Sequence, residues 1–232
     1  MNNEIDEQEQ QEVLEKPSLL GIITEPSTQF KRIKDNPKIL VPFIIVTILS
    51  VLGMLLMMTQ IDFLGDDPFF TDMTEEEVMI ATIFAQATFA ITGLLIPIVA
   101  ILINTVIYFI VAKIAKSAVT FKQMFSMNTF IYIIVVISTF VNAIGFFGMA
   151  NPDPEVYLTS LNSIVGADGV LGAILSSLEI FTIWSMIITA IGLQIVAKLS
   201  KGLSWGIVIV IFLITLGFAV GSAVVLELFE GM

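Results

Sequence analysis

The stretch LLIPIVAILINTVIYFIVAKIAKSAVTFK, residues 94–122, decides the fold. Its first part, from Leu94 to Ala112, contains no charged residue and is close to the roughly 20 residues that cross a bilayer core as a helix. Three lysines follow within ten residues of it, and basic residues gather on the cytoplasmic side of membrane proteins. The stretch therefore predicts a membrane-spanning helix that ends in the cytoplasm.

Four further apolar runs extend this pattern along the chain. We expect the five crossings at about residues 39–58, 94–112, 130–149, 180–197 and 205–226. Only this parity brings all ten basic residues to one side and leaves the loops on the other side without any lysine or arginine. The sequence thus predicts an all-α integral membrane bundle of five helices, with the N-terminus inside and the C-terminus outside. The basic residues that set this orientation are Lys16, Lys31, Arg32, Lys34, Lys38, Lys113, Lys116, Lys122, Lys198 and Lys201.

Composition excludes several classes of protein. Hydrophobic residues make up 56% of the chain, charged residues 13%, and the mean hydropathy is +0.97, whereas soluble domains contain roughly 25% charged residues. The net charge of −11 comes from acids confined to the tail and the loops, so it reports the orientation of the chain, and we expect no nucleic-acid partner. Cysteine and histidine are both absent, so thiol nucleophiles, imidazole bases and His/Cys metal sites are excluded.

The two ends of the chain are short and polar. Residues 1–16 are rich in acids and glutamines and should form a disordered cytoplasmic tail, because they cannot bury enough apolar surface to fold. Residues 227–232 form a short external tail. The domain between them divides into an interfacial segment, residues 17–38, and the membrane bundle, residues 39–226.

The interfacial segment predicts a short amphipathic helix. We expect Ser27 to be its N-cap, with Phe30 and Ile33 on one face and Lys31, Arg32 and Lys34 on the other. Two interpretations of these cations, and of Lys38, Lys113, Lys116, Lys198 and Lys201, stay open: contact with anionic lipid headgroups, or enforcement of topology alone.

Two outer segments predict further helices. Residues 75–92 begin at a capping box formed by Thr74 and Glu77 and should form an outer helix, kinked near Gly93–Pro97 into the second crossing. After a rigid turn at residues 151–154, apolar residues at helical spacing surround Gly166 and Gly169. We expect these outer helices to cap the bundle on its external face.

The sequence offers no catalytic constellation, cofactor site or metal site. No charged residue lies inside a predicted crossing, although coupled transporters usually need one. Most polar residues within the crossings should form hydrogen bonds between helices, and Asn104 could meet Asn142. They are Asn104, Thr105, Tyr108, Ser138, Thr139, Asn142, Thr189, Gln194 and Thr215.

The last crossing contains a GxxxG pattern at Gly217 and Gly221. Small residues at this spacing let two helix backbones approach closely. Two interpretations stay open: a contact with a partner or a second copy of the chain, or internal packing of the bundle.

Several short stretches resemble the Yip domain family of five-helix membrane proteins. They are LEIFTIW (178–184), IGL (191–193), LSKGLSW (199–205), TFKQ (120–123), and the segment from Glu25-Pro26 through Phe30 and Asn36-Pro37 to Pro42. The resemblance covers about residues 17–226. It implies a non-enzymatic membrane protein that acts through partners, although the Asp-Leu-x-Gly-Pro signature of the eukaryotic members is absent.

Length, tail and loop layout are similar to a bacterial member of that family. This resemblance implies an accessory or assembly subunit of an ABC exporter in the plasma membrane, which protects the cell against a toxic antimicrobial peptide. The alternative is a small-solute channel or a lipid-translocating carrier, with Asn104, Asn142 and Gln194 lining a polar path. In either case, we expect membrane lipids as partners and no cofactor.

Overall fold

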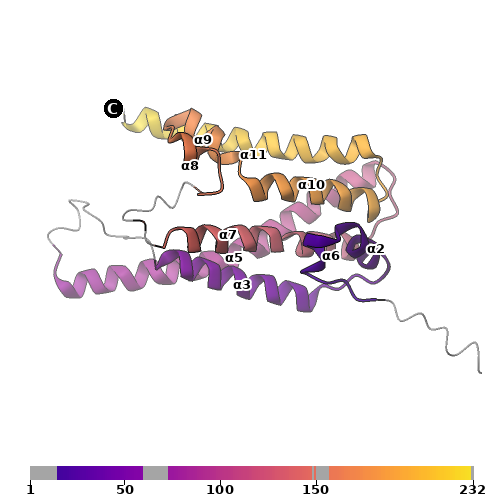
Figure 1. Cartoon of the computed structure of the whole chain (residues 1–232), viewed down its shortest axis with the longest axis horizontal. Coiled ribbons are helices and arrows are strands. Elements are labelled where there is room, and N and C mark those ends of the chain that lie inside the picture. The colour runs from indigo at the N-terminus through magenta and orange to yellow at the C-terminus, as the bar shows by residue number, and fades with distance from the viewer. Residues whose placement is uncertain (1–14, 60–72, 148, 150–156, 231–232) are drawn as a thin grey trace, which may run out of the picture.

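The computed structural model describes residues 15–59, 73–147, 149 and 157–230. Every named element in this part of the chain is a helix (Figure 1), which confirms the all-α class. The helices are α1 (Gly21–Thr24), α2 (Pro26–Asp35), α3 (Leu40–Met58), α5 (Glu75–Ile114), α6 (Phe121–Ile131), α7 (Ile133–Gly145), α8 (Asn162–Val165), α9 (Gly169–Ser177), α10 (Ile180–Ile195) and α11 (Lys201–Glu230).

Four of the described helical segments are long and apolar enough to cross a membrane: α3, α5, α11 and the span Phe121–Gly145. Helix α10 is also apolar but shorter. Its start at Ile180 and the bounds of α3 agree with the predicted crossings. The third span starts at Phe121 rather than residue 130, because the Thr120–Gln123 capping box satisfies the first backbone N–H groups there. The last helix extends beyond the predicted 205–226 at both ends.

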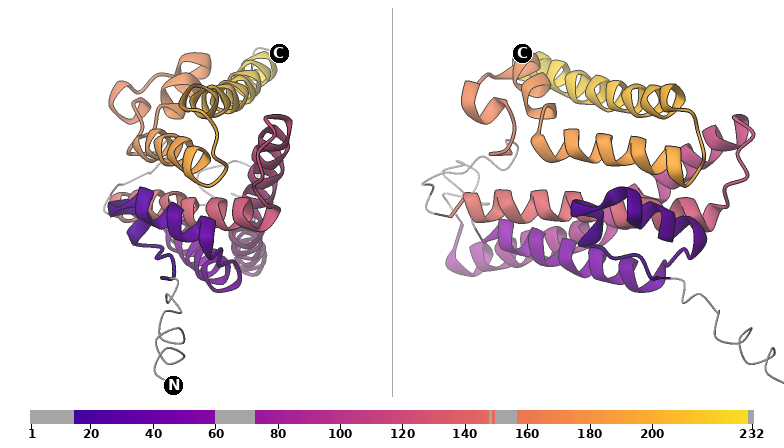
Figure 2. Two further views of the ribbon diagram at one scale, coloured as in Figure 1. Left: turned by 90° about the vertical axis from the view of Figure 1, so that its right-hand side faces the viewer. Right: turned by 45° about the vertical axis from the view of Figure 1, so that its right-hand side comes forward.

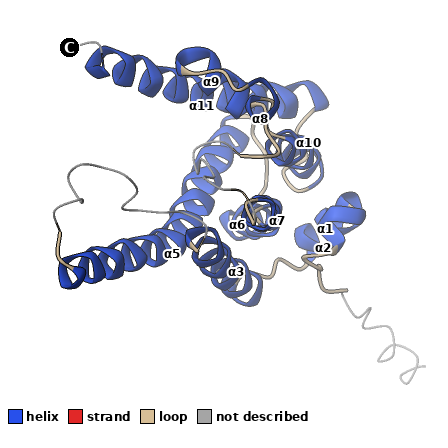
Figure 3. Cartoon of the chain, turned by 60° about the vertical axis from the view of Figure 1, so that its left-hand side comes forward, coloured by secondary structure: helices blue, strands red, loops and turns tan. Residues whose placement is uncertain are grey.

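The span Phe121–Gly145 forms the centre of the molecule. Residues 126–134 are all buried, and α6 and α7 join at Tyr132, which caps both. Figure 3, which looks along α7, shows α3, α5 and α10 around this central span. Helix α3 packs on α5 and α7, and α10 packs on α2, α6, α7 and α11.

Helix α5 runs without interruption through Pro97, and Figure 3 shows that it changes direction part-way along its length. The Thr74–Glu77 capping box is present as predicted. The first buried residue of α5 is Gly93. A Cβ at Gly93 would lie 3.2 Å from the Cα of Val51 in α3. Gly93 thus permits close approach of α3 and α5, while residues 75–92 are not buried within the described chain. They do not form a cap with α9, which packs instead on α11.

Helix α2 starts two residues earlier than predicted. Its N-cap is Glu25, Pro26 occupies the first turn, and Ser27 lies inside the helix, because proline is favoured where the backbone N–H needs no partner. Phe30 and Ile33 are fully buried, as the amphipathic pattern indicates. They pack in the main hydrophobic core, so this face of α2 is covered by protein.

The segments that carry the basic residues lie at one end of the bundle (Figures 1 and 2). The side chain of Gln123 donates to the carbonyl of Lys34, and Ser126 donates to the carbonyl of Lys38, both at 2.6 Å. Ser117 donates to the carbonyl of Ala197, which joins the α5–α6 and α10–α11 connections. At the opposite end, the backbone N–H of Val170 in α9 donates to Glu227 near the end of α11.

Candidate functional site: a cavity with a buried carboxylate

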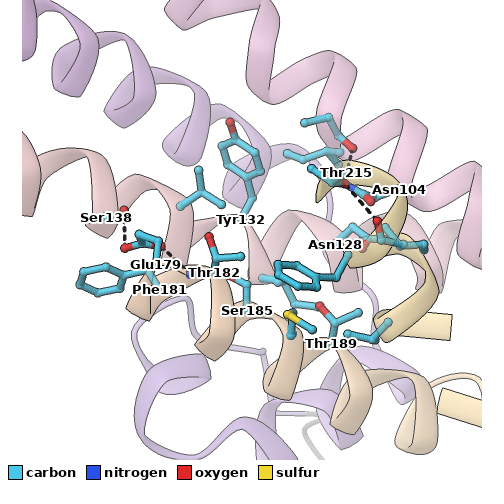
Figure 4. Close-up of a pocket in the computed structure, with 18 of the residues that line it drawn as sticks. Asn104, Asn128, Tyr132, Ser138, Glu179, Phe181, Thr182, Ser185, Thr189 and Thr215 are labelled. Atoms are coloured by element: carbon cyan, nitrogen blue, oxygen red, sulfur yellow. Dashed lines mark hydrogen bonds between the residues drawn. The ribbon is translucent and has the colours of Figure 1, made fainter. Parts of the chain in front are cut away.

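A cavity of about 450 Å³ lies among α5, α6, α7, α10 and α11 (Figure 4). Its wall is mainly apolar and the cavity is partly open to the surroundings. Polar groups converge at two places. Glu179, Ser138 and Thr182 lie at one end of the view in Figure 4, and Asn104, Asn128 and Thr215 lie at the other.

Glu179 is the acidic residue of the cavity wall and only 5% of it is exposed. Its Oε1 accepts hydrogen bonds from Thr159 Oγ1 at 2.7 Å and from Ser138 Oγ at 3.2 Å. Its Oε2 accepts one from the backbone N–H of Thr182 at 2.6 Å, so the carboxylate caps α10. Capping fits the sequence, because an acidic side chain directly before an apolar run can satisfy free N–H groups.

The chain between α7 and α10 holds Glu179 in place. The N–H of Leu161 donates to the carbonyl of Leu178, and the N–H of Ile180 donates to the carbonyl of Thr159. These two short segments also meet in an isolated antiparallel bridge between Ser160 and Glu179. Gly166 ends α8 in the left-handed conformation at φ 63°, which glycine adopts without steric penalty. The reversal of the chain thus brings Thr159 and Glu179 together.

Asn142 braces the same connection from α7. It is fully buried, donates to Thr159 Oγ1 at 3.2 Å and accepts from the backbone N–H of Thr159 at 3.3 Å. Tyr157 lines the cavity nearby. Although 39% of Tyr157 is exposed, partial burial, and then the negative charge of Glu179, raise the pKa of its phenol.

At the other end of the cavity, Asn128 of α6 donates to Thr105 Oγ1 of α5 at 3.2 Å. Asn104 lines the cavity but its amide donates to Ala100 in its own helix. Between the two ends, Ser185 of α10 lines the cavity, and its buried Oγ has no hydrogen-bond partner among the described residues.

The structure separates the site residues that the sequence predicts. Asn104 and Asn142 form no hydrogen bond with each other, and Gln194 bonds within its own helix. Thr139 and Thr215 also bond within their own helices, so the expectation that most of these side chains link helices is wrong. Among the predicted residues, Ser138 and Asn142 bond to other segments, and Thr105 accepts a hydrogen bond from Asn128 of α6.

Gly217 and Gly221 lie on an exposed face of α11. A Cβ at either position would meet no atom within 4 Å in the described chain, so they do not pack against another described helix. Contact with a partner or a second copy remains a prediction. The predicted basic residues lie at the end of the bundle where Ser117 joins the α5–α6 and α10–α11 connections. Lys31, Lys113, Lys116, Lys198 and Lys201 are exposed there, while Arg32 pairs with Glu15.

Sequence reasoning missed Glu179, Asn128, Tyr157 and Ser185 as members of one site. Glu179 stands one residue before the predicted fourth crossing, where an acid at the edge of the bilayer reads as solvated. The signal that points to a buried polar site is the pair Ser138 and Asn142, which lie one turn apart in a largely apolar run. In the structure Ser138 bonds to Glu179, and Asn142 bonds to Thr159. The described residues contain no group of three or more Asp or Glu residues that could hold a metal ion.

Comparisons with known proteins extend over nearly the whole chain. Residues 20–223 match the Yip1 domain, which confirms the resemblance predicted from the sequence. The chain is 34% identical over 223 residues to the protein named Membrane protein YknW from Bacillus subtilis (strain 168), covering 94% of this chain and 91% of that relative. No solved structure matches the chain.

Proposed function

Because the chain belongs to the Yip1 domain family of membrane proteins, we propose that it acts through contacts rather than catalysis, as an accessory or assembly subunit of an ABC exporter. The exporter would lie in the bacterial plasma membrane and protect the cell against a toxic antimicrobial peptide. The family resemblance motivates the choice of partner, and the similarity to a Bacillus subtilis membrane protein supports a bacterial setting.

The observation that carries the contact role is the exposure of α11. This helix is long enough to cross a membrane, yet only 11% of its most apolar window is buried by the rest of the chain. It packs on α9 and α10 and presents the face with Gly217 and Gly221 outward. A hollow lined by these glycines, Phe218 and Val225 follows the same face. Lipid can cover such a face, and so can a helix of a partner.

The alternative, a small-solute channel or a lipid-translocating carrier, loses part of its basis. Asn104 lines the cavity, but Asn142 and Gln194 do not, so the three residues do not form one polar path. No second function is proposed on their account.

Purification from the native host in mild detergent, followed by identification of co-eluting proteins, tests the proposal. We expect ABC exporter subunits to co-elute in stoichiometric amounts. A homogeneous preparation of this chain alone, with solute flux in reconstituted vesicles, would instead support the channel or carrier.

The proposed orientation places the N-terminus and the basic end in the cytoplasm. It is supported by the clustering of the basic segments at one end of the bundle. Engineered cysteines provide the test: Asp66→Cys and Asp168→Cys should react with an impermeant thiol reagent in intact cells, and Ala118→Cys should be protected. Labelling of position 118 from outside would reverse the orientation.

A further inference from the structure

The cavity has the length and wall chemistry of a slot for one hydrocarbon chain. Its lining extends along α5 from Ile96 to Tyr108 and along α10 from Phe181 to Thr189, which at 1.5 Å per residue are about 18 Å and about 12 Å. The apolar part of the wall includes Ile131, Met186 and Phe212. A volume of about 450 Å³ lies within the range of small-molecule sites, roughly 300–1,000 Å³.

The end at Glu179 presents a carboxyl group and no positively charged side chain. All ten lysine and arginine residues belong to the described part of the chain, and none of them lines the cavity. The carboxylate receives three hydrogen bonds, from Thr159, Ser138 and Thr182. A carboxylate has about four acceptor positions, so one remains for a donor from an occupant.

We propose that the cavity binds a single-chain amphiphile with an amino or ammonium head. The head lies at Glu179 and donates to the free acceptor position, and the alkyl chain lies along α10 toward Asn128. A phosphate-bearing headgroup does not fit, because its negative charge would lie beside Glu179 without any lysine or arginine in the wall. Since α5 and α11 are apolar helices and the cavity is partly open, the amphiphile reaches it laterally from the bilayer.

Photolabelling of the purified full-length chain tests this site without any partner protein, so its outcome is separate from that of the exporter proposal. The probe is a long-chain primary amine with a diazirine in the chain, compared with the alcohol and the monophosphate of the same chain. The protein is held in phosphatidylcholine nanodiscs, and labelled residues are mapped by mass spectrometry. We expect saturable labelling of the cavity wall on α5 and α10, about ten- to a hundredfold tighter for the amine than for the alcohol, and none for the monophosphate.

Three variants sharpen the assignment. Ala100→Phe fills the cavity and should abolish its labelling, while Val99→Phe adds the same ring to a neighbouring exposed position and should not. Glu179→Gln should remove the preference for the amine over the alcohol but keep labelling by the chain. Because Glu179 also caps α10, the Ala100 and Val99 pair decides the site if the Glu179 variant does not fold.

Each contrary outcome overturns the proposal. Labelling that does not saturate and falls on lipid-facing residues of all helices would mean that the cavity holds no specific ligand. Equal affinity for amine and alcohol would remove the role of Glu179. Loss of labelling when phosphatidylethanolamine replaces phosphatidylcholine would show that a phosphate-bearing amine lipid competes for the site, which contradicts the exclusion of phosphate headgroups. Unchanged labelling supports that exclusion.

Discussion

Helix α11 and the central span Phe121–Gly145 are both long and apolar enough to cross a membrane, but the chain buries 11% of the window of one and 61% of the other. The buried span is the less hydrophobic of the two, and it contains Ser126, Asn128 and Thr129, all buried. In a water-soluble protein, the more hydrophobic of two helices would be the more deeply buried one. Because lipid is as apolar as a leucine side chain, helices in a membrane pack through small and polar residues and leave their most apolar faces to lipid.

The same substitution in the two regions should give the largest contrast. Phe30 is fully buried against the core that includes the central span, whereas Phe218 on α11 is 75% exposed. We expect Phe30→Ala to destabilise the chain by about 3–5 kcal/mol, because a cavity forms and transfer energy is lost. Phe218→Ala should leave stability unchanged. Unfolding transitions in detergent micelles measure both, and similar shifts would show that α11 is covered in the free chain.

Added bulk gives the second contrast. A Cβ at Gly192 of α10 would lie 2.8 Å from Met127 Sδ and 3.0 Å from Phe30 Cζ, whereas one at Gly217 would meet nothing within 4 Å. Gly192→Ile should therefore destabilise the bundle by roughly 1–3 kcal/mol through overpacking. Gly217→Ile should not alter the unfolding transition. If Gly192→Ile is tolerated, α10 can move away from α2 and α6, and the central packing is looser than this geometry implies.

Two asparagines give a third contrast within the membrane domain. Asn142 is fully buried and bonds across to Thr159, whereas Asn104 bonds only to Ala100 in its own helix. Asn142→Ala leaves the backbone N–H of Thr159 without its partner and should lower stability by about 1–3 kcal/mol. Asn104→Ala should have little effect in the same unfolding assay. An equal loss at both positions would place Asn104 in a contact that its own-helix bond does not explain.

The sequence predicted the features that depend on local chemistry. The runs that begin α3 and α10, the Thr74 capping box and the buried face of α2 follow from hydropathy, capping and helical period. The side of the bundle that carries the basic residues follows from charge alone, and the described hydrogen bonds gather these segments at one end.

The cavity could not be predicted in the same way. Glu179 becomes a site residue only because the chain reverses between α7 and α10 and sets Thr159 beside it. Asn104 and Asn142 looked alike in the sequence, but their partners depend on which helix faces which. Pairing across segments leaves no periodic pattern in one chain, whereas the bonds within a helix, which most of these side chains form, are already possible in isolation.

The smallest effect on the chain itself should come from removing residues 1–15. Within the described residues this deletes Glu15, whose carboxylate pairs with Arg32 at the surface with 70% of the glutamate side chain exposed, and surface pairs contribute about 1 kcal/mol or less. Folding should survive, and so should co-purification of the partner, because the proposed contact lies on α11.

The matched variant carries Gly217→Ile and Gly221→Ile, which add branched bulk to a face that touches nothing in the described chain. This variant should insert and fold normally but lose the partner, since two backbones can no longer approach closely there. Both are compared by co-purification at equal abundance in the membrane. If the truncated chain loses the partner and the glycine variant retains it, the contact belongs to the N-terminal tail, and the exposed face of α11 is covered by lipid alone.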